Sequence, residues 1–93
     1  MYFSYIVRCA DGTLYCGYTC DPDRRIRTHN AGRGAKYTRS RLPVRLVYLE
    51  KFETKSEAMK REAALKRLSH GEKERLAAAF GAGEKEYIYL KKV

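Results

Sequence analysis

The chain has 93 residues, and its 20 basic and 11 acidic side chains give a formal net charge of +9. This length predicts one domain with a modest core and leaves no room for a second one. The excess positive charge favours a polyanionic partner, most often nucleic acid. An anionic membrane surface is the competing partner, but no long basic amphipathic helix supports it.

The chain is predicted to begin with a hairpin and a helix. Residues 2–9 are apolar and rich in β-forming side chains, and residues 13–18 return as a second strand after the turn at Asp11-Gly12. A helix is predicted over residues 22–30. Asp21 is its expected N-cap, because acceptor side chains are favoured there and proline is favoured directly after it.

Two capping boxes mark the helices of the second half. Thr54 with Glu57 and Ser69 with Glu72 each place a hydroxyl three residues before a glutamate. The predicted elements from there on are a loop at 31–42, a strand at 43–52, a helix at 55–68, a helix at 70–80, and a tail at 81–93 that is either a short strand or a loose end.

The resulting order, β-β-α-β-α-α, predicts the α+β class, with a three-stranded antiparallel sheet flanked by helices. Residues 1–80 form the predicted single domain. No apolar run reaches the length of a membrane span, and the first residues do not resemble a signal peptide. We therefore expect a cytoplasmic protein without a membrane partner.

The three cysteines, Cys9, Cys16 and Cys20, form no disulfide framework, which fits a reducing compartment. Cys16, Cys20 and His29 could be combined into a zinc site. Their spacing matches no common zinc pattern, so small buried hydrophobic residues are the favoured interpretation.

Basic residues gather in the middle of the chain. Residues 24–49 hold seven arginines, one lysine and no acidic residue. Arginine favours forked contacts to phosphate, and small and aromatic residues lie among the cations. The alternative is a soluble basic face without a partner. The candidate nucleic-acid-binding residues are Arg33, Lys36, Tyr37, Arg39 and Arg41.

Five residues are candidates for chemistry. Arg25 and His29 are four positions apart and share a helix face, although such pairs are common on wet surfaces. Tyr5 and Tyr15 lie in the predicted strands, where aromatic residues are common. On a basic domain, a tyrosine oxygen can act as base or nucleophile, an arginine can hold a phosphate, and a glutamate can hold a hard cation.

Glu62 is the candidate glutamate. On a helical wheel it falls between Ala58 and Met59, with Leu65 close by, on the arc that is expected to pack on the sheet. A carboxylate there needs a cation, a metal or several hydrogen-bond donors. A metal ligand and a buried salt bridge, for instance to Arg25, are both compatible with this position.

The length of the hairpin turn decides whether the two tyrosines can share a site. A two-residue turn would place Tyr5 and Tyr15 on opposite faces of the sheet, because side chains alternate along a strand. A three-residue turn with Gly12 in the left-handed conformation pairs Tyr5 with Gly17 and places both tyrosines on one face. We predict this odd-length turn, a gap beside Tyr5 at Gly17, and one cleft that holds Tyr5, Tyr15, Arg25 and Glu62.

Several short motifs together resemble the GIY-YIG nuclease domain, and most closely its small stand-alone bacterial members of the YhbQ-like type. Phe3 to Tyr5 and Tyr15 to Gly17 stand at the positions of the two name-giving motifs, followed by Arg25, His29 and Glu62. The pattern "HN-x-G-x-GAKYTR" spans 29–39, and "PVRLVY" spans 43–48. The resemblance extends over about residues 2–76.

The resemblance implies a fold, an activity and site residues. Similar domains occur in homing, restriction, junction-resolving and nucleotide-excision repair enzymes, which cleave DNA with one divalent metal. Glu62 would hold Mg²⁺ or Mn²⁺, Arg25 would contact the phosphate, and Tyr5 or Tyr15 would help to generate the attacking water. The chain departs from the pattern at Phe3, Ser4 and Cys16, and its only asparagine, Asn30, does not match the late asparagine of many members.

Three hypotheses follow from the sequence. The first is a metal-dependent endonuclease. The second is a nucleic-acid-binding module that kept the fold and lost turnover. The third is an interaction protein whose charges only keep it soluble. Glu62 separates the first two, because a pure binder gains nothing from an acid beside phosphate.

Overall fold

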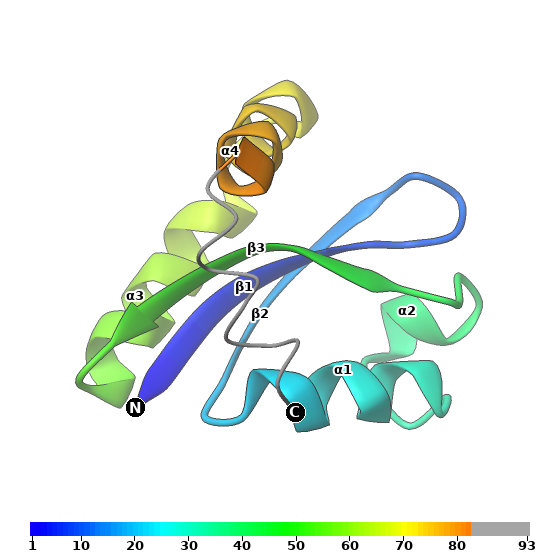
Figure 1. Cartoon of the computed structure of the whole chain (residues 1–93), viewed down its shortest axis with the longest axis horizontal. Coiled ribbons are helices and arrows are strands. Elements are labelled where there is room, and N and C mark those ends of the chain that lie inside the picture. Colours follow the sequence, from blue (N-terminus) through cyan, green and yellow to red (C-terminus); the bar gives the residue numbers. More distant parts are fainter. Residues whose placement is uncertain (83–93) are drawn as a thin grey trace.

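The computed structural model describes residues 1–82, and their elements follow the predicted order (Figure 1). The elements are β1 (Tyr2–Arg8), β2 (Leu14–Thr19), α1 (Pro22–Asn30), α2 (Lys36–Arg39), β3 (Arg45–Phe52), α3 (Lys55–Lys66) and α4 (His70–Ala82). The three strands form one antiparallel sheet in the order β2-β1-β3. The prediction of an α+β domain with this sheet is therefore confirmed.

The sheet separates two hydrophobic clusters, because successive side chains of β1 point to opposite faces. Tyr5 and Val7 lie in the cluster that includes Ile26 of α1. Ile6 lies in the cluster that includes Leu65 of α3. Figure 1 shows the sheet between α1 below it and α3 and α4 above it. Within residues 1–82, no helix is long and apolar enough to cross a membrane.

The hairpin has the predicted odd-length turn. The Cys9 backbone N–H donates to the Thr13 carbonyl at 2.8 Å, and Gly12 between them has a φ of 86°. This register pairs Tyr5 with Gly17 and Val7 with Tyr15. Because directly opposed residues share a face, Tyr5 and Tyr15 lie on the same side of the sheet.

Both predicted capping boxes are present, but the helix ends differ from the prediction. The Thr54 hydroxyl accepts from the Glu57 backbone N–H at 3.2 Å, and Ser69 and Glu72 are linked in the same way. Helix α3 ends two residues before the predicted Leu68. Helix α4 continues past the predicted tail boundary to Ala82. The rest of the predicted tail, 83–93, lies outside the described residues.

Residues 31–42 are not a plain loop, because they contain the short helix α2. The backbone N–H groups of Thr38 and Arg41 donate to the carbonyls of Ala35 and Thr38 at 3.1 and 2.9 Å. The Asn30 side chain holds the segment in place, since its amide donates to the Val44 carbonyl and its oxygen accepts from the Val44 N–H. No capping side chain precedes α2, which explains why the sequence pattern did not predict it.

Candidate active site

Tyr5 is the centre of a buried hydrogen-bonded cluster on the α1 side of the sheet. It lies on the central strand with a relative exposure of 1%. Its hydroxyl lies 3.0 Å from Nε2 of His29, and Nε of Arg25 donates to it at 3.3 Å. The i, i+4 spacing on α1 brings Arg25 and His29 to the same oxygen, so these two side chains act on Tyr5 as a pair.

Gly17 allows Tyr5 to reach the edge of the sheet. A Cβ atom at Gly17 would lie 2.5 Å from Cζ of Tyr5, far inside van der Waals contact. The gap that the sequence predicted beside Tyr5 is thus filled by the Tyr5 ring itself. As a result, the hydroxyl of a central-strand tyrosine lies over β2, which is an edge strand of the sheet.

Thr38 continues the cluster and defines the tautomer of His29. The Thr38 hydroxyl donates to the Ala35 carbonyl at 2.9 Å, because a carbonyl oxygen can only accept. The same Thr38 oxygen lies 2.9 Å from Nδ1 of His29, so it accepts a hydrogen bond from that nitrogen. The His29 proton is therefore assigned to Nδ1, and Nε2 accepts the proton of the Tyr5 hydroxyl.

Burial keeps both members of the Tyr5–His29 pair neutral. Burial, together with the positive charge of Arg25, lowers the pKa of His29 to about 4. Burial also raises the pKa of Tyr5 above its ordinary value, and the hydrogen bond from Arg25 opposes this shift. At neutral pH, Tyr5 consequently keeps its proton and donates it to an uncharged imidazole.

Tyr15 lies beside this cluster but is partly exposed. Its ring meets the His29 ring edge-on, with centroids 5.7 Å apart, and stacks on the Tyr37 ring at 5.9 Å. Within residues 1–82, its hydroxyl has no hydrogen-bond partner. Of the two motif tyrosines, Tyr15 therefore has the oxygen that is free to meet a water or a substrate.

Arg25 is partly exposed and keeps most of its donors available. Its Nε is used by Tyr5. Within the described residues, its two terminal nitrogens have no hydrogen-bond partner and no carboxylate pairs with it. A guanidinium held at one end by Tyr5 still offers a fork that suits two oxygens of a phosphate.

Glu62 lies on α3, which covers the other face of the sheet, and its side chain is 20% exposed. The predicted packing arc is partly wrong, because Ala58 and Leu65 are buried but Met59 is 44% exposed. The ion pair of Glu62 is with Lys66 at 3.5 Å, not with Arg25.

The negative charge of Glu62 nevertheless reaches the tyrosine cluster. It contributes to the raised pKa of Tyr5, and also to that of Cys16 on the α3 side of the sheet. The structure thus brings Tyr5, Tyr15 and Arg25 together on one face. The charge of Glu62 reaches Tyr5 of this group from helix α3, which packs on the other face.

Metal binding was expected at Glu62, which brings a single carboxylate. Within residues 1–82, no group of three or more histidine, cysteine or acidic side chains could hold a metal ion.

The three cysteines are free thiols. Cys9 and Cys16 are buried, and the expectation of a buried cysteine is wrong for Cys20, which is exposed.

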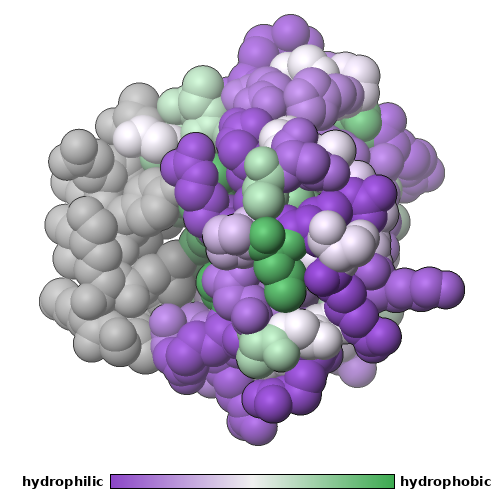
Figure 2. Space-filling model, turned by 90° about the vertical axis from the view of Figure 1, so that its right-hand side faces the viewer, coloured by the Kyte–Doolittle hydropathy of each residue, from purple (hydrophilic) through white to green (hydrophobic). Residues whose placement is uncertain are grey.

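The basic run divides into exposed and engaged residues. Arg33, Lys36 and Arg39 are exposed. Figure 2 views the side of the molecule that carries the β1–β2 turn and the segment after α1, and hydrophilic residues dominate that surface. The Arg41 guanidinium lies 4.0 Å from the Tyr37 ring centroid, and its Nε donates to Asp11 at 3.1 Å. Tyr37 and Arg41 are thus already engaged within the protein.

Two residues of the cluster were not predicted from the sequence. Thr38 holds His29, and buried Gly34 packs so closely on the imidazole that any Cβ there would collide with it. Both lie inside the stretch "GAKYTR" at residues 34–39, which resembles the family pattern. The length of that match was the only signal that could have singled them out.

The fold and this cluster define the class of protein. Residues 1–75 match the family model described as the GIY-YIG catalytic domain. The chain therefore belongs to the GIY-YIG family.

Its relatives are small proteins named UPF0213. The chain is 55% identical over 76 residues to UPF0213 protein VNG_2274C of Halobacterium salinarum, covering 82% of this chain and 99% of that protein. It is 59% identical over 64 residues to UPF0213 protein SAG0778 of Streptococcus agalactiae, covering 69% and 73%. The solution NMR structure of EF2693 from E. faecalis matches with a TM-score of 0.57 and 47% identity, covering 87% of this chain and 86% of that one.

Proposed function

We propose that this protein is a metal-dependent endonuclease that hydrolyses phosphodiester bonds in nucleic acid, with DNA as the expected substrate. The observation that carries the proposal is the buried Tyr5–His29–Arg25 cluster, which presents an arginine fork beside an exposed basic run. Within residues 1–82 the terminal nitrogens of Arg25 have no protein partner, so they are available to a phosphate.

Each residue of the cluster has a role in this proposal. The two terminal nitrogens of Arg25 bind the scissile phosphate and stabilise the charge that grows on it in the transition state. Tyr5 holds Arg25 in position, and His29 in turn holds Tyr5. The free hydroxyl of Tyr15 accepts a hydrogen bond from the attacking water.

Glu62 fits a weakly held divalent cation. A partly buried carboxylate whose ion-pair partner is an exposed lysine at 3.5 Å can exchange that partner for a metal ion. Mg²⁺ is commonly bound through one or two carboxylates together with substrate phosphates, so one glutamate suffices once nucleic acid is present. When bound, Mg²⁺ or Mn²⁺ supplies charge neutralisation at the leaving oxygen.

The reaction is a hydrolysis. The water oxygen forms a bond to phosphorus, and the bond between phosphorus and one ester oxygen breaks. The products are a phosphate monoester and a free hydroxyl group.

The three free cysteines fit an enzyme that works in the reducing cytoplasm.

The second candidate function is a nucleic-acid-binding module without turnover. The exposed basic run serves this function equally well, and the ion pair between Glu62 and Lys66 favours it, because a paired glutamate can be purely structural. The two candidates differ in the role of a divalent metal ion, because the endonuclease needs the ion at Glu62 for cleavage and the binding module does not need it.

The test is cleavage of labelled duplex, branched and single-stranded DNA and of RNA, with Mg²⁺ or Mn²⁺. Glu62→Gln is expected to abolish cleavage, whereas nucleic-acid binding without metal holds or improves. Glu57→Gln on the same helix is the matched control, since glutamine can also complete a capping box. Cleavage by Glu62→Gln at the wild-type rate would exclude the metal role. Binding without cleavage by the wild type on every substrate would favour the binding module.

A further inference from the structure

A hollow of about 510 Å³ adjoins the candidate active site at one end of the sheet. Its lining residues come from the start of β1, the end of β2 with the loop after it, α1 and the start of α3, and the ends of these strands and helices meet at the lower left of Figure 1. This volume lies within the usual range of small-ligand sites. Its lining residues are Tyr2, Tyr18, Thr19, Cys20, Arg25 and Lys55.

The lining combines positive charge with aromatic surface. Arg25 and Lys55 supply two cations, and none of the lining residues within 1–82 is acidic. Nζ of Lys55 lies 5.9 Å from the ring centroid of Tyr18. Phosphate groups seek cations, and nucleobases stack on aromatic rings whatever their sequence. A nucleotide carries both groups at a fixed separation, so it is the ligand class that matches this lining.

Arg25 belongs to the hollow and to the tyrosine cluster at once. Its Nε is fixed by Tyr5, which leaves its terminal nitrogens for a ligand. Resting on the proposed function, we propose that the hollow binds the nucleotide next to the scissile phosphate. Its base stacks on Tyr18, its outer phosphate contacts Lys55, and the phosphate that it shares with the scissile bond contacts Arg25.

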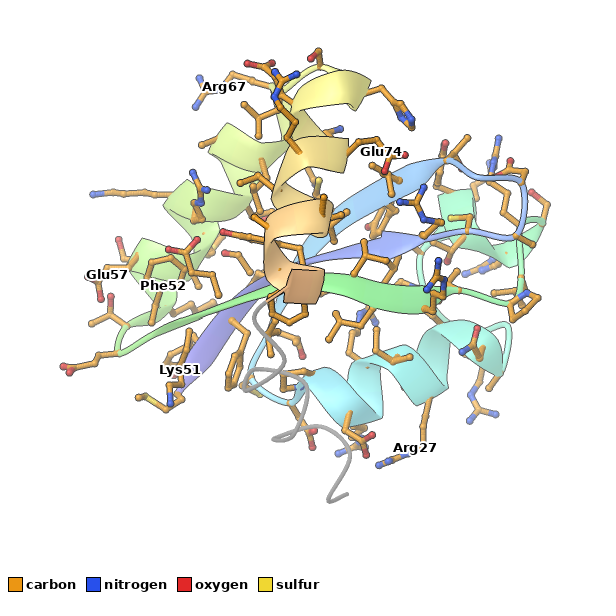
Figure 3. The ribbon with its side chains drawn as sticks, turned by 45° about the horizontal axis from the view of Figure 1, so that its top comes forward. Arg27, Lys51, Phe52, Glu57, Arg67 and Glu74 are labelled. Atoms are coloured by element: carbon orange, nitrogen blue, oxygen red, sulfur yellow. The ribbon has the colours of Figure 1, made fainter. Side chains whose placement is uncertain are left out.

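A second basic hollow provides a comparison. It measures about 620 Å³ and is lined by Arg24, Arg27, Thr28, Ala31 and Arg33 on the outer side of α1, where Figure 3 shows Arg27 pointing away from the sheet. Within the described part of the chain, its lining includes no aromatic ring and no residue of the tyrosine cluster. Arg27 in it is already paired with Asp23. That hollow suits backbone phosphates, and it offers nothing that would recognise a base.

The test is NMR titration of the ¹⁵N-labelled full chain with thymidine 3′,5′-bisphosphate, and with inorganic phosphate as the probe without a base. The bisphosphate is expected to shift the amide signals of Tyr18, Thr19, Cys20 and Lys55. Inorganic phosphate is expected to bind more weakly and to leave Tyr18 unshifted. The spectrum of each variant also reports whether it is folded.

Variants separate stacking from charge. Tyr18→Ala is expected to weaken bisphosphate binding about fivefold or more, in line with the usual contribution of one stacked base. Lys55→Ala is also expected to weaken it, because a charge-assisted contact to the outer phosphate is lost. Tyr18→Phe keeps the ring and is expected to keep the affinity. Lys60→Ala, which removes an exposed lysine from the same helix, is the control for net charge.

Two outcomes would overturn the proposal. One is that the shifts are confined to the hollow on the outer side of α1. The other is that both alanine variants bind the bisphosphate as tightly as the wild type. Neither readout requires cleavage, so an absence of DNA cleavage would count against the proposed nuclease alone.

Discussion

Thr38 illustrates how one buried hydroxyl can set the chemistry of a neighbour. It is fully buried, it donates to the Ala35 carbonyl, and it accepts from Nδ1 of His29. This assignment leaves Nε2 of His29 unprotonated, so the imidazole can hold the Tyr5 hydroxyl. A hydrogen bond between two side chains 24 positions apart thus depends on a third side chain from α2.

Thr38→Val is expected to break this chain. The variant leaves the Nδ1–H group of His29 buried without an acceptor, which costs about 1–3 kcal/mol of unfolding free energy. The tautomer with the proton on Nε2 then gains population, which ¹⁵N NMR of the imidazole detects. Thr38→Ser, which keeps the hydroxyl, is the control. Equal stability and equal imidazole spectra in all three proteins would refute the tautomer assignment.

The low pKa of His29 predicts a specific loss of stability in acid. The folded pKa of about 4 lies below the ordinary value of 6.5, so the unfolded chain binds this proton first as the pH falls. The neutral imidazole contributes fully to the free energy of unfolding above pH 6.5. This contribution is lost as the pH falls to about 4, and stability changes no further from this group below that pH. This loss amounts to about 3 kcal/mol.

Urea unfolding at a series of pH values measures this loss, and His29→Gln is expected to remove it. Glu74 does not obscure the result. Its hydrogen-bonded ion pair with Arg8 lowers its pKa to about 2, so its contribution is lost only below its ordinary value of 4.5. A wild-type stability that does not change between pH 6.5 and 5 would contradict the buried neutral imidazole.

At the scale of elements, the hairpin is what positions the tyrosines. Its odd-length turn sets the register, and the register places Gly17 opposite Tyr5. Without a side chain on β2 at this point, the Tyr5 ring lies flat over the strand. The hairpin therefore determines both which face carries the tyrosines and how far the Tyr5 hydroxyl extends.

Gly17→Ala is expected to destabilise the protein by about 1–3 kcal/mol and to displace Tyr5 from His29, because the new methyl group overlaps the Tyr5 ring. Denaturant unfolding measures the first effect, and the imidazole NMR signals report the second. Gly71→Ala in α4 is the control, since a Cβ atom there meets nothing within 4 Å. If both variants unfold at the same urea concentration, the close contact does not limit this position.

At the scale of the molecule, exposed cations lie on several elements, but their arrangement along the chain is uneven. Arg33, Lys36 and Arg39 lie together on the segment after α1. Lys51 and Arg67 extend from other parts of the surface, as Figure 3 shows. We therefore expect the affinity for nucleic acid to depend on which cations are removed and not on net charge alone.

Replacing Arg33, Lys36 and Arg39 together by alanine is expected to weaken nucleic-acid binding about equally on all sequences. The slope of log affinity against log salt is negative, and its magnitude should decrease by about 1 for each phosphate that no longer meets a cation of the protein. Replacing Lys51, Lys60 and Arg67 by alanine removes the same charge from other exposed positions and is expected to change the slope less. Fluorescence anisotropy at several salt concentrations measures both. Equal slopes for the two triple variants would show that the run is not the contact surface.

The sequence by itself determined the order of elements apart from the short helix α2, the capping of α1, α3 and α4, and the shared face of Tyr5 and Tyr15. These features depend on local spacing and turn geometry, which neighbouring residues encode. The sequence also singled out Arg25 and His29, since an i, i+4 pair on a predicted helix shares one face wherever that helix packs.

Only the tertiary structure decided how these residues meet. The hydrogen bond of His29 with Thr38, the filling of the space above Gly17 and the engagement of Arg41 by Asp11 all join different elements or loops, whose side chains meet only after the chain has packed. Glu62 shows the limit most clearly, because its i, i+4 pair with Lys66 is local but the choice between Lys66 and Arg25 is not. The helices that carry Arg25 and Glu62 pack on opposite faces of the sheet, and this packing gives Arg25 to Tyr5 instead.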